Sequence, residues 1–166
     1  MHSLAKKLMM ARKLSFGEDG VAELLDNDVF LMYGSMLFHL QDKAGDDVSY
    51  DIGRELGHSI VDDIKKMGLS GTKMIDFIMD LLTMKGLGEF QVEKFDLKSK
   101  KGEVWVKNNI VLREAEKAKK KQVKNTFIEG LLAGVFSKNY GLEIACKEIA
   151  CVSGSNKLCR FSLKTG

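Results

Sequence analysis

The hydrophobic period changes from about four residues to two near the middle of the chain, and this change constrains the fold most. An amphipathic helix is predicted where apolar residues recur every four positions: Val48, Ile52, Leu56, Ile60 and Ile64. Further along, "EFQVEKFDL" and "EVWVKNNIVL" alternate apolar and polar side chains around "KSKKG", as the two strands of an antiparallel hairpin do. Helices followed by hairpins predict an α+β fold with an antiparallel sheet.

The remaining elements follow from the same two periods. Helical spacing predicts helices over residues 29–40, in "SGTKMIDFIMDLLTMKGLG" and in "NTFIEGLLAGVFSKNYG", while the charged stretch "REAEKAKKKQVK" is expected to be a solvated loop or a first helical turn. "LEIACKEIAC" and "KLCRFSL" are predicted strands around the turn "VSGSN". Residues 1–28 are expected to form an N-terminal arm or short helices, and residues 29–166 a single domain.

Two of the predicted helices carry glycines four residues apart, Gly53 with Gly57 and Gly130 with Gly134. A glycine inside a helix costs about 1 kcal/mol relative to alanine, so such pairs indicate close approach of another backbone or of a ligand. Helix packing is one interpretation. The other is a ligand pocket, in which the glycines leave room beside an adaptable wall of apolar side chains: Met74, Phe77, Ile78, Leu81, Trp105 and Phe127. A filled hydrophobic core is the alternative to that pocket.

Charge and apolar run length exclude several classes of protein. The 166 residues include 26 Lys or Arg and 23 Asp or Glu, a formal net charge of +3, which argues against a pervasive basic face and a direct nucleic-acid partner. The apolar runs are far shorter than the roughly 20 residues that span a bilayer. In "MHSLAKKLMMARKLSFGEDG", Lys and Arg interrupt the apolar residues, so no secretory signal core forms, and a cytoplasmic location is predicted.

The stretch "CKEIACVSGSNKLC" contains Glu148 and all cysteines of the chain: Cys146, Cys151 and Cys159. An odd number of cysteines in one stretch is not typical of a secreted disulfide framework, and it favours thiols or metal ligands over bridges. Along a strand, Cys146 and Glu148 share one face, and strict alternation places Cys151 on the opposite face. These groups therefore converge only if the strand bulges or turns near residues 149 and 150.

Three interpretations of the cysteine stretch remain open. Converging thiolates and a carboxylate would suit zinc, which takes four tetrahedral ligands, but the spacing is neither C-x₂-C nor that of a zinc finger. Inert buried thiols and a redox site are the alternatives. An enzymatic function is not favoured: His2, His39 and His58 are the candidate imidazole bases, and phosphate-loop, dinucleotide and nucleophile-elbow motifs are missing from the sequence.

Two stretches resemble known families. "KEIACVSGSNKLCRFSL" resembles the C-terminal signature of the 4-vinyl reductase-like domain, in which a Glu and a nearby Cys precede a glycine-containing turn, another Cys and an apolar strand. "LMYGSMLFHLQDKAGDDVSYDIGRELGHSIVDDI" is similar to the first helices of the small TRAPP vesicle-tethering subunits. The two families share one fold, the NO-signalling and Golgi-transport ligand-binding fold, with helices packed on one side of an antiparallel sheet and often with a dimeric assembly.

The resemblance implies a sensor domain that binds a small apolar molecule between helices and sheet, forms a homodimer and holds a structural zinc. The family's zinc ligands are one Glu and three Cys, which implies this role for Glu148, Cys151 and Cys159. By spacing, the family's first zinc cysteine corresponds to Asn125, a poor zinc ligand, so Cys146 is the candidate for the fourth. The alternatives are a non-enzymatic assembly module like the TRAPP subunits and an accessory protein of vinyl reduction in tetrapyrrole synthesis.

Overall fold

The computed structural model describes residues 14–16, 22–24, 27–29, 33–99, 101–120, 123–152 and 158–165. The chain divides into two units, Met1–Tyr33 and Gly34–Gly166. The described residues of the first unit include a small antiparallel sheet of three strands: β1 (Leu14–Phe16), β2 (Ala22–Leu24) and β3 (Asn27–Val29). The rest of the arm or short helices predicted over residues 1–28 lies outside the described residues.

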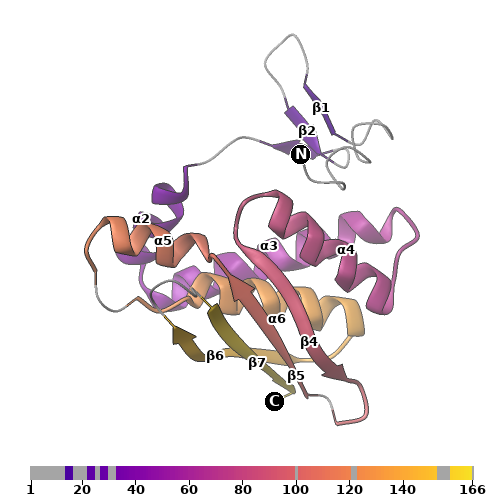
Figure 1. Ribbon diagram of the computed structural model, residues 1–166. Coiled ribbons are helices and arrows are strands. Elements are labelled where there is room, and N and C mark those ends of the chain that lie inside the picture. The colour runs from indigo at the N-terminus through magenta and orange to yellow at the C-terminus, as the bar shows by residue number, and fades with distance from the viewer. Residues whose placement is uncertain are drawn as a thin grey trace. The chain divides into compact units, whose positions relative to one another are not determined.

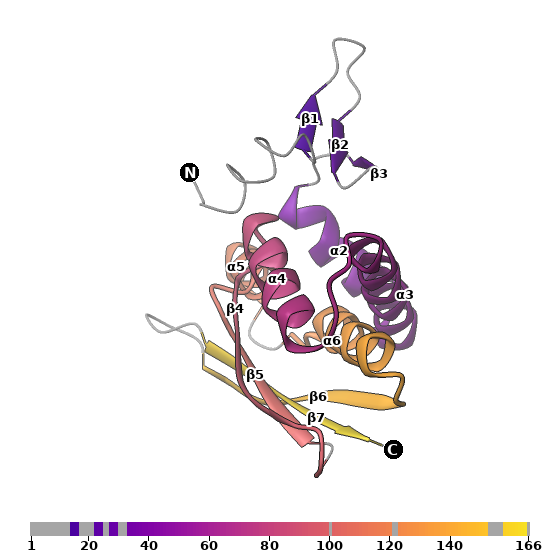
Figure 2. The same cartoon turned by 90° about the vertical axis from the view of Figure 1, so that its right-hand side faces the viewer.

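The second unit has its helices on one side of a four-stranded antiparallel sheet with the order β4-β5-β7-β6 (Figures 1 and 2). Helix α4 lies on β4, helix α6 lies on β6, and α3 packs along α6. This arrangement confirms the predicted α+β class. The elements are α2 (Gly34–Ala44), α3 (Asp46–Lys65), α4 (Gly71–Met84), β4 (Glu89–Asp96), β5 (Lys101–Lys107), α5 (Ile110–Lys117), α6 (Thr126–Tyr140), β6 (Ile144–Val152) and β7 (Leu158–Thr165).

Helices α3 and α6 approach so closely that neither glycine pair has room for a side chain. A Cβ on any of the four glycines would lie well under 3.0 Å from a backbone carbonyl oxygen of the facing helix: Gly53 from Phe127, Gly57 from Leu131, Gly130 from Tyr50 and Gly134 from Arg54. The glycines therefore serve helix packing. The expectation that they leave room for a ligand is wrong, because the facing backbone fills that space.

The apolar row of α3 does not follow one face of the helix. Ile60 and Ile64 are buried, whereas the first three members of the row are 37–48% exposed: Val48, Ile52 and Leu56. A helix turns by about 100° per residue, so each four-residue step rotates the side chain by about 40°. The row therefore winds from the surface at its start to the core at its end.

Two element boundaries differ from those that the sequence predicts. The helix expected from residue 29 begins at Gly34, because Val29 ends strand β3. The charged stretch after β5 contains a helix, α5, whose first turn Asn109 caps by accepting a hydrogen bond from the backbone N–H of Val111 at 2.9 Å. Its buried residues, Ile110, Val111 and Ala115, anchor this otherwise charged helix to the core.

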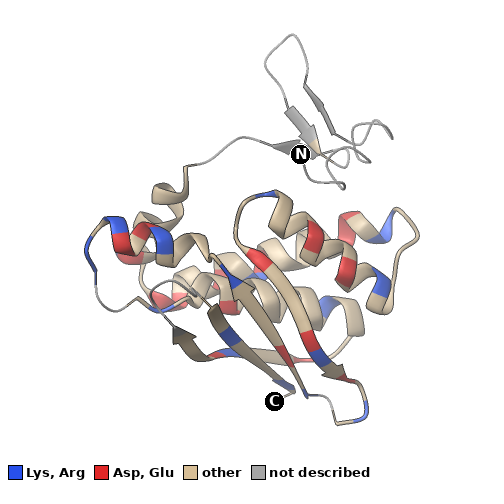
Figure 3. Cartoon of the chain, in the orientation of Figure 1, with Lys and Arg blue, Asp and Glu red and all other residues tan. Residues whose placement is uncertain are grey.

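The charged side chains of the described residues do not segregate by sign. Lys and Arg are interspersed with Asp and Glu along both helices and strands (Figure 3). Among these residues, no helix combines the length and the apolar character needed to cross a membrane.

Candidate functional site

Strand β6 contains a bulge that turns two of the predicted site residues to the same face. Its pairing with β7 runs from Glu148↔Phe161 to Ala150↔Arg160, so Ile149 is an extra residue in β6. An extra residue shifts the alternation of side chains by one position. The predicted site residues can converge only if the strand bulges near residues 149 and 150, and the structure confirms this bulge.

The bulge brings together Glu148, Cys151 and Cys159. Within the described part of the chain, their donor atoms all lie within 4.8 Å of one another, so this group could hold a metal ion. Cys159 is buried, Glu148 is half-buried and Cys151 is exposed. Burial raises the pKa of the Glu148 carboxyl above its usual value, and a hydrogen bond from Asn125 acts in the opposite direction.

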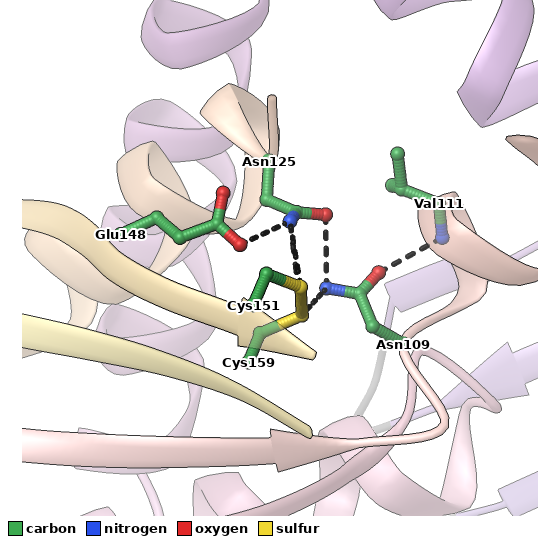
Figure 4. The surroundings of a disulfide bond; sticks show 6 residues. All are labelled: Asn109, Val111, Asn125, Glu148, Cys151 and Cys159. Atoms are coloured by element: carbon green, nitrogen blue, oxygen red, sulfur yellow. Dashed lines mark hydrogen bonds between the residues drawn. A yellow bond between two sulfur atoms is a disulfide. The ribbon is translucent and has the colours of Figure 1, made fainter. Parts of the chain in front are cut away.

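Cys151 and Cys159 are joined by a disulfide (Figure 4). The two residues pair directly across β6 and β7, and their Cα atoms lie 4.1 Å apart. The expectation favoured thiols or metal ligands over bridges, and the structure has a disulfide at this pair, although the same two sulfur atoms belong to the group that could hold a metal ion. That expectation rested on the number of cysteines, whereas the register of the hairpin decides whether two of them meet.

Cys146, the expected fourth metal ligand, is a free and buried thiol outside this group. It precedes Cys151 in β6 and therefore pairs farther along the antiparallel β7, with Leu163. Burial is the main cause that raises the pKa of its thiol well above the usual value, and the nearby Glu129 carboxylate adds to the effect. Cys146 therefore belongs to the neutral interior under α6.

The side chain of Asn125, at the start of α6, faces the group from the position where a fourth ligand would lie. Asn125 is fully buried. Its Nδ2 donates to Oε1 of Glu148 at 2.8 Å and also to the two sulfur atoms, at 3.8 Å for Cys159 and 4.0 Å for Cys151. Figure 4 shows this amide between the carboxylate and the disulfide.

A chain of hydrogen bonds fixes the direction of the Asn125 amide. The backbone N–H of Val111 donates to Oδ1 of Asn109, so Asn109 has only Nδ2 to offer toward Asn125. That Nδ2 donates to Oδ1 of Asn125 at 3.0 Å. The Nδ2 of Asn125 must then face the group, and an N–H donor cannot coordinate a cation. The residues present do not fit a structural zinc with four protein ligands.

Glu129 holds strand β6 against α6 beside the bulge. Its carboxylate is only 3% exposed, and it accepts hydrogen bonds from the Glu148 backbone N–H at 2.8 Å and from Nζ of Lys147 at 3.0 Å. The hydrogen bond from Lys147 to Glu129, together with the charge of that carboxylate, raises the pKa of Lys147. Glu129 is not among the site residues predicted from the sequence. A single acidic residue inside the apolar run "FIEGLL" was the available signal, since a buried carboxylate needs a partner.

Five of the six residues predicted to line a ligand pocket belong to the helices. Met74, Ile78 and Leu81 of α4 are at most 1% exposed, Phe127 of α6 is buried, and Phe77 is half-buried. The structure thus places these residues in the interior or at its edge. Their role as a pocket wall stays a prediction.

Trp105 lies apart from these five residues. Its neighbours on β5, Val104 and Val106, are fully buried toward the helices, so alternation places Trp105 on the other face of the sheet. There its Nε1 donates to Oε1 of Glu103 at 2.8 Å. Trp105 therefore cannot line a pocket between helices and sheet. Its inclusion in the predicted wall assumed the wrong face of strand β5.

Two depressions lie on the surface formed by the described residues, away from the predicted wall on α4. One, of about 230 Å³, adjoins Trp105, the start of β4 and the end of β5. The other, of about 370 Å³, lies beside Phe38 and Gln41 of α2 and the residues that precede α6. Met74, Ile78 and Leu81 line neither of them.

No protein-family model and no curated protein matches the sequence. Several solved structures share the fold, including the following three. The phenol-responsive sensory domain of the transcription activator PoxR, crystallised with phenol, aligns with a TM-score of 0.79 and 20% identity over 99% of this chain and 91% of that chain. A vinyl-4-reductase family protein from Methanocaldococcus jannaschii aligns with a TM-score of 0.50 and 20% identity, covering 71% and 68%.

The third solved structure is a trafficking protein particle complex subunit 3 from Naegleria fowleri, covalently bound to palmitic acid. It aligns with a TM-score of 0.56 and 16% identity over 81% of this chain and 90% of that chain. These likenesses confirm the resemblance at the level of the fold. At such low identities they show the fold alone.

Proposed function

We propose that this chain is a sensor domain that binds a small apolar molecule. One observation carries the proposal: the fold matches a phenol-responsive sensory domain over almost the full length of both chains. The apolar interior between the helices and one face of the sheet supplies the chemistry that such a ligand needs.

The ligand is placed against the inner side of α4 and the first turn of α6. Met74, Ile78 and Leu81 of α4 and Phe127 of α6 are buried, and Phe77 of α4 is half-buried. These side chains already fill the interior, so a ligand can enter only where they repack, which unbranched Met side chains allow. A binding event that must rearrange α4 changes the shape of the domain, and this change is what a sensor transmits.

Phenol and larger alkyl phenols are the probes for this site, with binding measured by calorimetry and thermal shift. The Ile78→Ala variant removes part of the proposed wall, and Ile75→Ala is its matched control, because Ile75 is a buried isoleucine of the same helix outside that wall. Each truncation should cost about 2–5 kcal/mol of stability. We expect only Ile78→Ala to change probe affinity, and Trp105→Ala to leave it unchanged.

If no aromatic or alkyl probe binds or shifts the Tm of the wild-type protein, the sensor proposal fails. The alternative is then an assembly module, the use that the resemblance to TRAPP subunits implies. Stable complexes with a partner protein in the absence of any small molecule would favour it. Nothing in the geometry of the described residues favours the third alternative, an accessory protein of vinyl reduction. A cytoplasmic location stays a prediction.

We further propose that the sensor acts as a homodimer through the exposed start of the α3 row. Val48, Ile52 and Leu56 are 48%, 40% and 37% exposed and lie within about 80° of one another around the helix. Light scattering should give twice the mass of one chain. Ile52→Glu should yield monomers, whereas Met67→Glu, the same change at an exposed apolar residue outside the row, should not. A monomeric wild type would exclude this assembly.

A structural zinc, which the family resemblance implies, is left out of the proposed function. Zinc would require Cys151 and Cys159 as thiolates, together with Glu148, and a fourth ligand. The side chain in the fourth position, Asn125, presents a hydrogen-bond donor to the group. The metal content of the reduced protein decides this point.

A further inference from the structure

We propose that Cys151 and Cys159 form a redox clamp that works without a metal ion, with the Asn125 amide in the position of a fourth ligand. The clamp joins the end of β6 to the start of β7 through the disulfide. It reaches the start of α6 through Asn125 and the start of α5 through Asn109 (Figure 4). This inference does not depend on whether the domain binds a ligand.

Hydrogen-bond donors converge on the sulfur atoms. The Sγ of Cys159 accepts from Nδ2 of Asn125 at 3.8 Å and from Nδ2 of Asn109 at 3.9 Å, and the Sγ of Cys151 accepts from Asn125 at 4.0 Å. Sulfur in a disulfide or a thiolate can accept such bonds, whereas a bound cation would face the positive end of both amides. The surroundings thus fit a sulfur pair that opens and closes better than a metal centre.

Exposure assigns different roles to the two cysteines. Cys151 is exposed, so in the reduced protein its sulfur can meet a molecule from solution. Cys159 is fully buried and lies directly across the strand pair, so it can react only with Cys151. This pairing of an accessible attacking thiol with a buried resolving thiol is what a reversible disulfide requires.

The oxidant is a low-molecular-weight disulfide such as oxidised glutathione. Cys151 loses its proton, and its thiolate attacks one sulfur of that disulfide, which forms a mixed disulfide and releases one small thiolate that takes up a proton. Cys159 then loses its proton, and its thiolate attacks the Cys151 sulfur and releases the second small thiolate, which takes up a proton. The two cysteines lose two electrons, and one small disulfide becomes two thiols. Reduction reverses both steps.

The redox step is tested by equilibrating the protein in glutathione buffers, quenching with acid, alkylating under denaturing conditions and measuring the intact mass. Oxidised chains should carry one alkyl group, on Cys146, and reduced chains three. The Cys146→Ser variant is the matched control. Its oxidised chains should carry no alkyl group, and its reduced chains should carry two. Two results would overturn the proposal. In the first, the chain carries three alkyl groups in every glutathione buffer. In the second, it carries one alkyl group, and excess dithiothreitol does not raise that number to three.

The role of Asn125 is tested by metal content. After reduction, incubation with zinc and desalting, the wild type should retain far less than one zinc per chain, and Asn125→Cys should retain close to one. Asn125→Asp supplies a carboxylate ligand that cannot form a new disulfide, and it should also gain zinc. The proposal is wrong if the reduced wild type retains stoichiometric zinc, or if neither variant retains more than the wild type.

Discussion

Helix α6 is fixed at two junctions, along its flank by α3 and at its start by the Glu148, Cys151 and Cys159 group, and the two junctions differ in chemistry. At the flank, glycines bring backbone against backbone, and no side chain can adjust. At the start, amide, carboxylate and sulfur atoms meet through hydrogen bonds and a disulfide. Reduction can alter the second junction, whereas the backbone contacts of the first include no thiol and no titratable group.

The difference shows how one helix can be both anchored and adjustable. The α3–α6 contact sets the position of α6, since its carbonyl oxygens occupy the space of the missing side chains. The polar group at its start then determines how firmly the β6–β7 hairpin is attached. Substitutions should therefore cost most at the glycines and progressively less toward the polar group and the outer face of the sheet.

The largest effect is expected for Gly53→Ala. Alanine would gain about 1 kcal/mol of helix propensity, but its Cβ would collide with the Phe127 carbonyl oxygen, so we expect a net loss of at least about 3 kcal/mol. Gly34→Ala is the contrast, because there the added Cβ meets only side-chain atoms, those of Ile110 and Glu114, which can move, and the loss should stay below about 1.5 kcal/mol. Urea unfolding measures both. Equal losses of stability would show that a Cβ that meets backbone atoms costs no more than one that meets movable side chains.

The next effect is expected from opening the disulfide. Cys151 and Cys159 are eight residues apart, and a bridge over so short a loop contributes about 2–3 kcal/mol by restricting the unfolded chain. Reduction should therefore lower the Tm by about 5–10 °C. The Cys151→Ala/Cys159→Ala double variant should match the reduced wild type and should not respond to dithiothreitol. A reductant-sensitive double variant would place the effect elsewhere.

Local patterns in the sequence predict the elements of both junctions but not their partners. The four-residue glycine spacing indicates that each helix needs a close neighbour, yet it does not identify that neighbour, because Gly53 and Gly130 are far apart in the sequence. Likewise, the four-residue row on α3 predicts the helix correctly and its buried face only in part. Periodicity gives the secondary structure, and the angle at which α3 meets α6 selects the face.

The sequence likewise predicts some features of the cysteine site and not others. Alternation along β6 predicts that Glu148 and Cys151 meet only across a bulge, and the bulge is present. The sequence does not give the register of β6 against β7, so it could not show that Cys151 faces Cys159. Asn109 and Glu129 were missed because each acts on a residue that the fold, and not the sequence, brings near.

At the polar junction, substitution of Asn109 is expected to have an effect of intermediate size on stability. Asn109→Ala removes the cap of Val111 and the donor to Asn125 together, and it should cost about 1–2 kcal/mol. Asn109→Asp keeps an acceptor for Val111 but has no N–H for Asn125, so it isolates the loss of the donor. We expect it to lie between wild type and Asn109→Ala in chemical denaturation. A variant as stable as wild type would show that the amide chain does not hold the junction.

The smallest effect is expected on the outer face of strand β7, which carries Arg160 next to Cys159. Hydrogen bonds from Arg160 and then from Trp105 hold the pKa of Glu103 below its ordinary value of 4.5. A carboxyl with a lowered pKa in the folded state stabilises the protein above its unfolded pKa, and this contribution is lost as the pH falls through the folded pKa. The wild type should therefore lose part of its stability below about pH 4.5, and Glu103→Gln should lose less.

Thermal unfolding across the acid range, with and without added salt, measures this contribution. Arg160 is exposed and Glu103 is half-buried at the surface, where an ion pair contributes little. The difference between wild type and Glu103→Gln should therefore be small and should shrink in salt. It should also be the same with the disulfide closed or reduced, because Glu103 and Arg160 lie on the face of the sheet opposite the sulfur atoms. A pH profile that depends on the redox state would show that strand β7 transmits changes from the clamp to its outer face.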